Sequence, residues 1–297
     1  MTILKRLALT LLLAGATANA WAAAKTAACS SECLLDLVNH YLDAMIAHDA
    51  SALPFAPGLK ATENGKVIQP GEGMWKTAQA FLYRHTVADP SAGQAAFFGV
   101  VKEEEGQALL VIRLAVADGK ITEAETMVAR KGAHPNSNPD RLRTVAGIWT
   151  SPVPQEDRLS RTRLMEIADS YFEGLEKHSA EAVPFHPDCN RTENGTRTTN
   201  TDPEPNWSSC SKGFKEMTAI KKVRERRYPV VDEKRGLVLS ISVFDIVPDL
   251  PNSVTGSNDP PLSMLLYELF KIDDGRIREI EGFMRDEPPG FSNGWGK

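Results

Sequence analysis

The feature that most constrains this chain is an internal repeat: residues 41–65 recur at 171–195, without insertion, at an offset of 130 positions (171 − 41). Both windows end in the same four residues, Thr62-Glu63-Asn64-Gly65 in the first and Thr192-Glu193-Asn194-Gly195 in the second. The other matched positions include the pairs Tyr41/Tyr171, His48/His178, Pro54/Pro184 and Phe55/Phe185. Self-similarity at a fixed offset is typical of a duplicated structural unit, so the chain is predicted to contain two copies of one fold.

The first residues predict export. Lys5-Arg6 precede an apolar run at 7–16, and Ala18-Asn19-Ala20 has the small-x-small pattern of a cleavage site. Residues 1–20 are therefore predicted to be a signal peptide, which sends the mature chain to the periplasm or outside the cell. The apolar run is about ten residues, against roughly 20 for a membrane span, so no membrane insertion is expected.

The charge balance narrows the partners. The chain has 39 acidic and 34 basic residues, and its basic run at 221–227 is interrupted by Glu225. Nucleic acid is not an expected partner for an acidic protein of this kind. A small-molecule substrate or ligand is expected instead, and the sequence leaves open whether chains associate into homo-oligomers.

Four cysteines in an exported chain suggest disulfides, although four thiols allow three pairings. Local pairing is the expectation. Cys189 and Cys210 flank a polar, proline-rich segment, and closing a loop of about 20 residues contributes roughly 3 kcal/mol in the loop-entropy model. Cys29 and Cys33 are four positions apart and can also form a bridge. Zinc is the rival interpretation, but no CxxC pair occurs and the six histidines are scattered, so no metal is expected.

Periodicity and turn residues predict an α+β fold in two domains. Apolar residues at helical spacing cover 34–46, and Asn64-Gly65 supplies the positive φ angles of a hairpin turn. A further helix is expected around 74–80, followed by strands at 95–101, 108–117 and 121–128, and the second copy ends in strands at 265–272 and 277–284. The proline-rich stretch 131–156 reads as a linker, so the expected domains are 29–130 and 157–288.

The same order of elements and motifs resembles the SnoaL-like division of the nuclear transport factor two superfamily. The resemblance is carried by His48-Asp49-Ala50, Leu53-Pro54-Phe55, Asp118-Gly119, the Cys29-to-Cys33 start and the repeated Thr-Glu-Asn-Gly. The last two features are similar to those of an uncharacterised family of secreted bacterial and fungal tandem proteins. The resemblance implies two cone-shaped domains, each with helices packed on a curved antiparallel sheet around an apolar pocket. Members often dimerise sheet to sheet, so the two copies are expected to form an internal pseudo-dimer.

Four residues are the candidates for catalysis: Glu268, Glu193, His85 and Tyr228. Glu268 alternates with Leu266 and Phe270, so it is expected to face apolar neighbours, where desolvation raises a carboxyl pKa towards the range of a general base. A salt bridge or an edge-strand position is the alternative. Glu193, like Glu63, precedes a turn that does not require glutamate. Histidine side chains as a class suit proton transfer near neutral pH, and His85 adjoins an aromatic residue, although a core histidine is the default interpretation.

The candidates for substrate binding are Arg113, Arg224, Tyr83, Trp75 and Glu63. Arg224, Arg226 and Tyr228 fall on one face if 221–228 is a regular strand, which would make an anion or phenol site. Arg113 could hold a substrate anion, or could pair with Glu123 or Glu125. The pairs Glu123/Glu125 and Glu279/Glu281 are expected on solvated outer faces.

The function expected from these residues is that of an exported, cofactor-independent lyase or isomerase. It would perform acid–base chemistry, such as elimination or loss of formaldehyde, on an apolar or aromatic small molecule. Motifs of serine hydrolases and nucleotide-binding enzymes are absent from the sequence. The alternatives are a non-catalytic periplasmic binding or accessory protein, and a structural pseudo-dimer with filled pockets. Extra segments in the second copy favour different roles for the two pockets.

Overall fold

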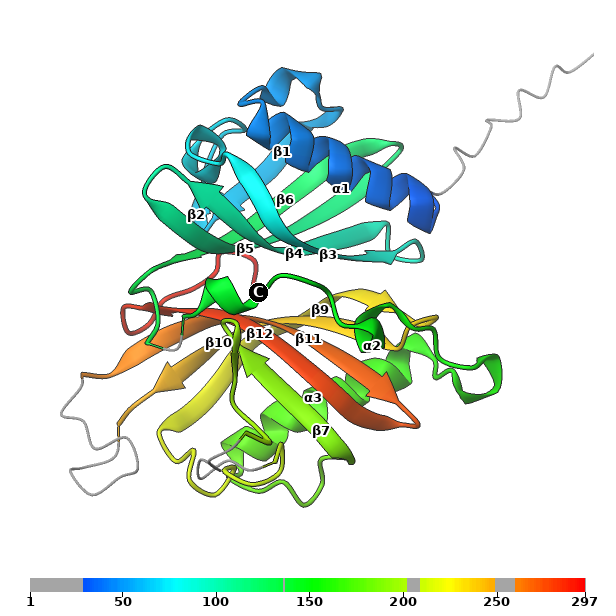
Figure 1. Ribbon diagram of the computed structural model, residues 1–297, viewed down its shortest axis with the longest axis vertical. Coiled ribbons are helices and arrows are strands. Elements are labelled where there is room, and N and C mark those ends of the chain that lie inside the picture. The colour runs from blue at the N-terminus through cyan, green and yellow to red at the C-terminus, as the bar shows by residue number, and fades with distance from the viewer. Residues whose placement is uncertain (1–28, 136, 202–208, 249–259, 297) are drawn as a thin grey trace, which may run out of the picture.

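The computed structural model describes residues 29–135, 137–201, 209–248 and 260–296. The predicted signal peptide, 1–20, lies outside the described residues. Each copy of the repeat begins with a helix and continues into a six-stranded sheet (Figure 1).

Domain 1 contains α1 (Ser31–Ile46), the short 3₁₀ helices η1 (Ala50–Ala52) and η2 (Gly73–Lys76), and six strands: β1 (Phe55–Glu63), β2 (Lys66–Val67), β3 (Ala80–Asp89), β4 (Gln94–Glu103), β5 (Gly106–Ala117) and β6 (Lys120–Arg130). Its strand order is β2-β1-β6-β5-β4-β3.

Domain 2 repeats this arrangement with α3 (Arg161–Glu176), β7 (Phe185–Glu193), β8 (Thr196–Arg197), β9 (Ile220–Asp232), β10 (Leu237–Ile246), β11 (Leu262–Asp273) and β12 (Arg276–Glu287). Its strand order is β8-β7-β12-β11-β10-β9. Between the domains lie η3 (Pro139–Arg141), α2 (Gly147–Thr150) and η4 (Gln155–Asp157). The α+β architecture with two tandem domains is confirmed.

Two local expectations were wrong. The sheets are mixed rather than antiparallel, because β1 pairs with β6 and β7 pairs with β12 in parallel. The helix expected around 74–80 is one 3₁₀ turn, η2, and β3 begins at Ala80. The run of β-favouring residues after Gln79 extends the sheet instead.

The opening helices begin at serine caps, and they end before the repeated histidines, as the repeat predicted. Ser30 caps α1 by accepting a hydrogen bond from the Cys33 backbone N at 3.2 Å, and Ser160 caps α3 in the same way. His48 and His178 follow the two helices with φ angles of +56° and +50°. This left-handed conformation stops a helix and turns the chain towards the first strand.

Each helix covers one face of its own sheet and encloses a separate core (Figure 1). We call the space between α1 and its sheet cone 1, and the space between α3 and its sheet cone 2. Cone 1 is lined by residues such as Leu34, Trp75 and Phe97, and cone 2 by residues such as Phe172, Phe214 and Phe270.

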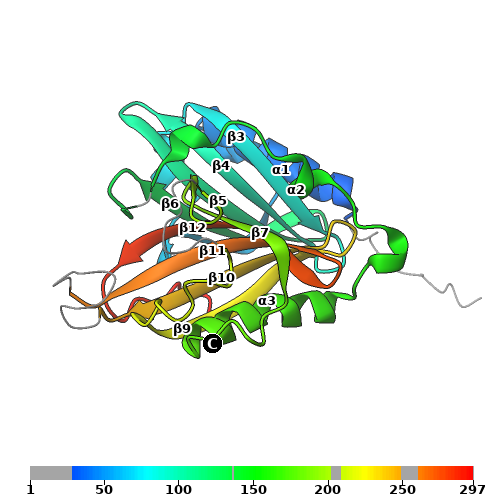
Figure 2. The same ribbon diagram turned by 60° about the horizontal axis from the view of Figure 1, so that its bottom comes forward.

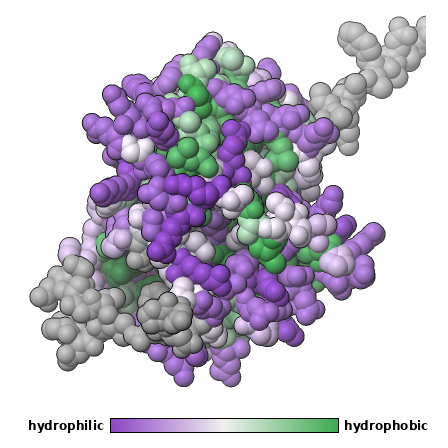
Figure 3. Space-filling view, viewed as in Figure 1, coloured by the Kyte–Doolittle hydropathy of each residue, from purple (hydrophilic) through white to green (hydrophobic). Residues whose placement is uncertain are grey.

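The opposite faces of the two sheets pack against each other (Figure 2). This third core contains Phe98 and Val111 from domain 1, Leu239 and Tyr267 from domain 2, and Trp149 from α2. The sheet-to-sheet pseudo-dimer therefore forms within one chain. The outer surface seen in Figure 3 is mainly hydrophilic, and its apolar side chains gather only in small patches.

Two glutamates expected on solvated faces are buried in this interface instead. Glu125 of β6 accepts a hydrogen bond from the Tyr267 hydroxyl at 3.0 Å and pairs with Arg227 at 2.5 Å and Arg113 at 2.8 Å. Glu281 of β12 accepts from the Tyr83 hydroxyl at 3.1 Å. Strand alternation placed both carboxyls on the outer faces correctly, but the other domain covers those faces.

The repeated Asn-Gly turns have a structural explanation. Asn64 and Asn194 adopt φ angles of +50° and +48°, and their side-chain Oδ1 atoms accept hydrogen bonds from the backbone N of Val128 and Met284, each at 2.8 Å. Each asparagine therefore joins the hairpin to the last strand of its own domain in chain order, β6 or β12.

The glycine in each turn is required because a segment of the chain packs closely against it. That segment follows the last strand of the other domain. A Cβ at Gly65 would lie 2.8 Å from Cζ of Phe291, and one at Gly195 would lie 2.3 Å from the carbonyl O of Asn138. The linker thus covers the hairpin of domain 2, and the C-terminal segment covers the hairpin of domain 1. This reciprocal cover ties the two domains together.

Both predicted disulfides are present. Cys29 pairs with Cys33 and Cys189 with Cys210, which leaves no free cysteine. Two disulfides indicate that the chain folds in an oxidising compartment. Among the described residues, no helix is long and apolar enough to cross a membrane.

The Asn194 turn gives a stability prediction. Asn194 is fully buried, and its side chain both accepts from Met284 N and donates to Met284 O, so Asn194→Ala strands two backbone groups and strains the positive φ. We expect a loss of about 3 kcal/mol in the free energy of unfolding, measured by denaturant titration.

Asn194→Gly is the matched control, because glycine accepts the positive φ but makes neither hydrogen bond. It should lose less than Asn194→Ala, by about 1 kcal/mol. Equal losses would show that backbone strain contributes nothing at this turn.

Candidate active site in the second cone

Cone 2 contains a buried carboxyl group, that of Glu268 on β11. The strand directs Glu268 to the same side as Leu266 and Phe270, as its alternation predicted, and only 2% of its surface is exposed. Burial, together with the negative charge of Glu193, raises the pKa of Glu268 to about 8, and Arg191 opposes this rise. At pH 7 Glu268 therefore carries its proton.

This pKa changes the role expected for Glu268. A carboxyl group that is protonated at neutral pH can donate a proton or a hydrogen bond, so Glu268 is suited to act as an acid, and as a base only above about pH 8. Its Oε2 atom has no hydrogen-bond partner among the described residues. The hydroxyl of Ser242, on the neighbouring strand β10, also faces cone 2, is buried, and lacks a partner there.

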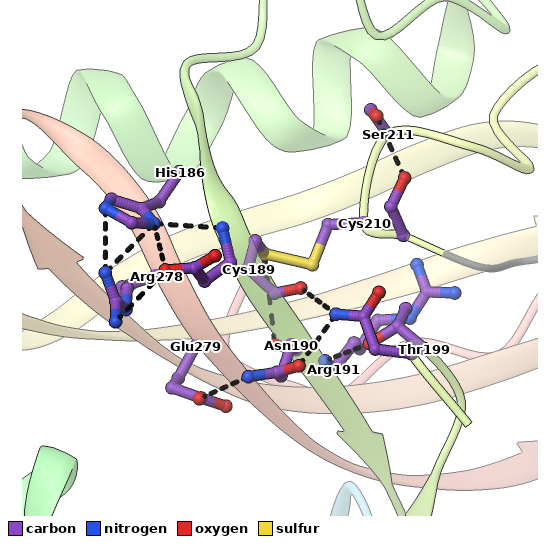
Figure 4. The surroundings of a disulfide bond; sticks show 12 residues. His186, Cys189, Asn190, Arg191, Thr199, Cys210, Ser211, Arg278 and Glu279 are labelled. Atoms are coloured by element: carbon purple, nitrogen blue, oxygen red, sulfur yellow. Dashed lines mark hydrogen bonds and ion pairs between the residues drawn. A yellow bond between two sulfur atoms is a disulfide. The ribbon is translucent and has the colours of Figure 1, made fainter. Parts of the chain in front are cut away.

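Beside Glu268 lies a buried cation. Arg191 of β7 is fully buried, and its guanidinium bonds to the Glu193 carboxylate at 2.9 Å and donates to the Tyr171 hydroxyl at 3.3 Å. Although burial opposes the charge, Glu193 and Tyr171 raise the pKa of Arg191, so it stays a cation. Figure 4 shows Arg191 on the strand that carries Cys189, whose disulfide partner Cys210 lies in the loop before β9.

Tyr228 closes one side of this cone. Its hydroxyl donates to Asp169 on α3, and burial raises its pKa well above the ordinary value. Arg226 also reaches α3, at 3.0 Å from Asp169 and 2.8 Å from Glu176. Three of the four catalytic candidates, Glu268, Glu193 and Tyr228, therefore line one cone.

His85, the fourth candidate, lies elsewhere. It is buried between the two sheets, where Nδ1 is 3.3 Å from Glu281 and the ring is 5.4 Å from that of Trp149. Tyr83 lies in the same interface and donates to Glu281. Neither side chain faces a cone, because the face of β3 that carries them packs on domain 2.

The arginine candidates are held in ion pairs. Arg113 pairs with Glu123 at 2.7 Å and with Glu125 at 2.8 Å, which is the alternative that the sequence left open. Arg224 pairs with Asp245 at 2.8 Å. The expectation that Arg224 shares a face with Arg226 and Tyr228 was wrong, because Glu225 has φ +55° and the β9 register shifts there. A bulge of this kind reverses the alternation of side chains.

Trp75 and Glu63 lie in cone 1. Trp75 is buried against Tyr41, with ring centroids 4.9 Å apart and its indole N donating to the Tyr41 hydroxyl at 3.3 Å. Glu63 accepts from the Met74 backbone N at 2.7 Å, and burial raises its pKa. Both residues therefore close cone 1.

The two cones differ in one row of side chains that crosses the middle of each sheet. In domain 1 the paired residues Phe97, Ile112 and Thr126 form this row. The equivalent row in domain 2 is Ser240, Glu268 and Gly282. In domain 2 two of these positions hold smaller residues and the third holds a carboxyl. This row therefore gives cone 2 a buried carboxyl that cone 1 lacks at the same position.

Arg191 was missed at the level of sequence, although the repeat contains the signal. At the offset of 130 its counterpart is Ala61, which lies in the apolar core of cone 1. Identity between the copies singles out Glu63 and Glu193 but not Arg191. A functional residue of one copy is more easily seen as a difference between them.

A hollow of about 830 Å³ lies outside both cones, at the rim of domain 1. Its lining includes Thr77, Glu103, Arg130 and Asp140, and Glu103 and Arg130 within it are bonded to each other at 2.8 Å. It contains none of the candidate residues.

Fold and site define the class of this protein: two tandem α+β domains, each a helix packed on a six-stranded mixed sheet, joined sheet to sheet and with a buried carboxyl in the second cone. The chain belongs to the family described as Domain of unknown function (DUF8021), whose model matches residues 27–128 and 157–284. No curated protein matches the chain. The structure of AusH from Aspergillus nidulans is similar to 46% of this chain and 92% of its own, at 13% identity and a TM-score of 0.29.

The raised pKa of Glu268 predicts how stability depends on pH. The folded protein keeps a proton that the unfolded chain releases above the ordinary value of 4.5, so the free energy of unfolding falls as pH rises from about 4.5 to about 8. The expected loss is on the order of 4 kcal/mol, and Glu268→Gln should remove it.

Denaturant unfolding at pH 5.5 and 8.5 checks this prediction, with exposed Glu104→Gln as the matched control. The free energy of unfolding of wild type, relative to that of Glu268→Gln, should be lower at pH 8.5 than at pH 5.5. The account fails if all three proteins lose the same stability between these values.

Proposed function

We propose that this protein is an exported, cofactor-independent lyase or isomerase, and that cone 2 is its active site. The observation that supports this most strongly is the buried Glu268 carboxyl, which lies near the Arg191 cation and has one oxygen atom without a partner among the described residues. A buried, unpaired acid destabilises a fold, and functional sites are where such groups are found.

The geometry supports a cleavage that needs one acid and one base. In the loss of formaldehyde from a hydroxymethyl-bearing aromatic compound, the hydroxyl proton passes to the Glu193 carboxylate. The oxygen forms the carbonyl bond of formaldehyde as the carbon–carbon bond breaks, and the electron pair of that bond passes to the ring carbon, which takes the proton of Glu268. The proton on Glu193 returns to Glu268 before the next turnover. Arg191, bonded to Glu193, stabilises negative charge during the transfer. The products balance without an oxidant or a reductant.

Domain 1 contributes structure rather than chemistry. Its counterparts of Arg191 and Glu268 are Ala61 and Ile112, both buried among apolar side chains. At these two positions cone 1 therefore has neither an acid nor a cation, and domain 1 covers the interface face of the domain 2 sheet.

Ligand binding without turnover is the second candidate function. The rings of Tyr171, Phe172 and Phe270 contact one another edge to face in cone 2 and would bind an aromatic ligand without any proton transfer. Measurements on Glu268→Gln separate the two functions, because a binding protein would keep its role when the acid is replaced by an amide.

The test is release of formaldehyde from a panel of hydroxymethyl phenols by the mature chain. Glu268→Gln should lower turnover at least about 100-fold, since it removes the proton donor. Glu123→Gln is the matched control, because Glu123 lies in domain 1 on the sheet face outside cone 1, and 40% of its side chain is exposed. Equal loss in both variants would contradict a site in cone 2, and binding without release by wild type would favour the second function.

A further inference from the structure

Two equivalent turns close the two cones. In domain 1 the Met74 carbonyl accepts hydrogen bonds from the backbone N of Thr77 and Ala78, and Trp75 follows Met74 into cone 1. In domain 2 the Gly213 carbonyl accepts from Glu216 and Met217 in the same pattern, and Phe214 follows Gly213 into cone 2. Trp75 and Phe214 are therefore equivalent plugs, buried to 2% and 1% exposure.

The plug of cone 1 is anchored by polar contacts. The Met74 backbone N donates to Glu63 at 2.7 Å, the Trp75 indole N donates to Tyr41 at 3.3 Å, and the imidazole Nδ1 of His48 lies 2.5 Å from the Trp75 carbonyl O. These contacts join the turn to β1, to α1 and to the end of α1. Opening cone 1 would break all of them.

The plug of cone 2 has a different attachment. Glu193, the counterpart of Glu63, pairs with Arg191 at 2.9 Å instead of with the plug. Phe214 has no polar side-chain atom, and its ring contacts Tyr171 and Phe185 edge to face at centroid distances of 5.5 and 5.6 Å. Such contacts can be replaced by those of another ring, since they are non-covalent and carry no buried hydrogen bond.

From this contrast we propose that cone 2 binds an uncharged aromatic molecule in the space filled by the Phe214 ring, and that Phe214 is the gate that moves to admit it. This rests on the proposed function, whose substrate class it narrows. An aromatic ring in that place regains the edge-to-face contacts with Tyr171 and Phe185. Its polar substituent lies towards the row of Ser240, Glu268 and Gly282, where domain 1 has Phe97, Ile112 and Thr126.

Charge balance selects an uncharged ligand. The positive charge of Arg191 is matched by the negative charge of Glu193, and protonated Glu268 adds no charge. An anion would find no unmatched cation among the described residues of the cone, and its desolvation would not be offset. A neutral hydroxyl or carbonyl oxygen instead accepts a hydrogen bond from Glu268.

The first measurement is native-state amide hydrogen exchange on the wild-type mature chain. The equivalent amides of the two turns form the matched comparison: Glu216 and Met217 in the gate, and Thr77 and Ala78 in the anchored plug. We expect the gate amides to exchange at least about 100-fold faster than the plug amides through local opening. Equal protection of the two turns overturns the gate.

The second measurement is binding of three probes, benzyl alcohol, benzoate and cyclohexylmethanol, followed by NMR. Wild type should bind benzyl alcohol at least about ten-fold more tightly than either of the others, and Phe214→Ala should improve that affinity a further ten-fold because no ring must be displaced. Binding should weaken above pH 8, and Glu268→Gln should abolish this pH dependence. Equal affinity for benzyl alcohol and benzoate overturns the substrate class.

These outcomes separate the inference from the proposed function. Selective binding of benzyl alcohol by cone 2 with no turnover of any hydroxymethyl phenol supports the gate and contradicts the enzyme. Glu268-dependent turnover of an anionic or aliphatic substrate supports the enzyme and overturns the inference. If Phe214→Ala does not fold, Phe214→Leu and the exchange measurement on wild type give the same decision.

Discussion

The structure depends on the reciprocal burial of two carboxyl groups between the sheets. Glu125 of domain 1 is bonded to Tyr267 and Arg227 of domain 2, and Glu281 of domain 2 is bonded to Tyr83 of domain 1. A buried carboxylate without partners would cost several kcal/mol, so each sheet needs the other to satisfy its own glutamate. This interaction fixes the sheets face to face, and it leaves the opposite face of each sheet to pack against its own helix.

Once the sheets are fixed, the copies are free to diverge in their interiors. In domain 1 the cone is filled by Trp75, Phe97 and Ile112, and Glu63 accepts a hydrogen bond from the backbone of the plug turn. In domain 2 the cone contains Arg191 and Glu268. Glu193, which is equivalent to Glu63, pairs with Arg191. The two copies therefore share one fold and differ in the side chains that fill their cones.

Local physics made much of this predictable from the sequence. The repeat predicted two domains, the Asn-Gly pairs predicted hairpin turns, and period-two alternation placed Glu268 towards cone 2. Alternation cannot say what covers a sheet face, and for that reason Glu125 was expected in solvent and Arg113 was proposed for a substrate. The φ of +55° at Glu225 has no signal in the residue type, so the faces of Arg224 and Arg226 could not be separated. His85 was chosen for its chemistry alone, and the interface that buries it depends on contacts between residues almost 200 positions apart.

The central claim is that Glu268 keeps its proton at neutral pH inside cone 2. The most direct measurement is a ¹³C NMR titration of the Glu268 carboxyl in the mature chain, with the resonance assigned from Glu268→Gln. The account predicts a midpoint near 8, and a smaller value in a variant that removes the Glu193 charge. A midpoint near the ordinary value of 4.5 would contradict it, because a carboxyl that ionises so readily is neither desolvated nor able to donate a proton at pH 7.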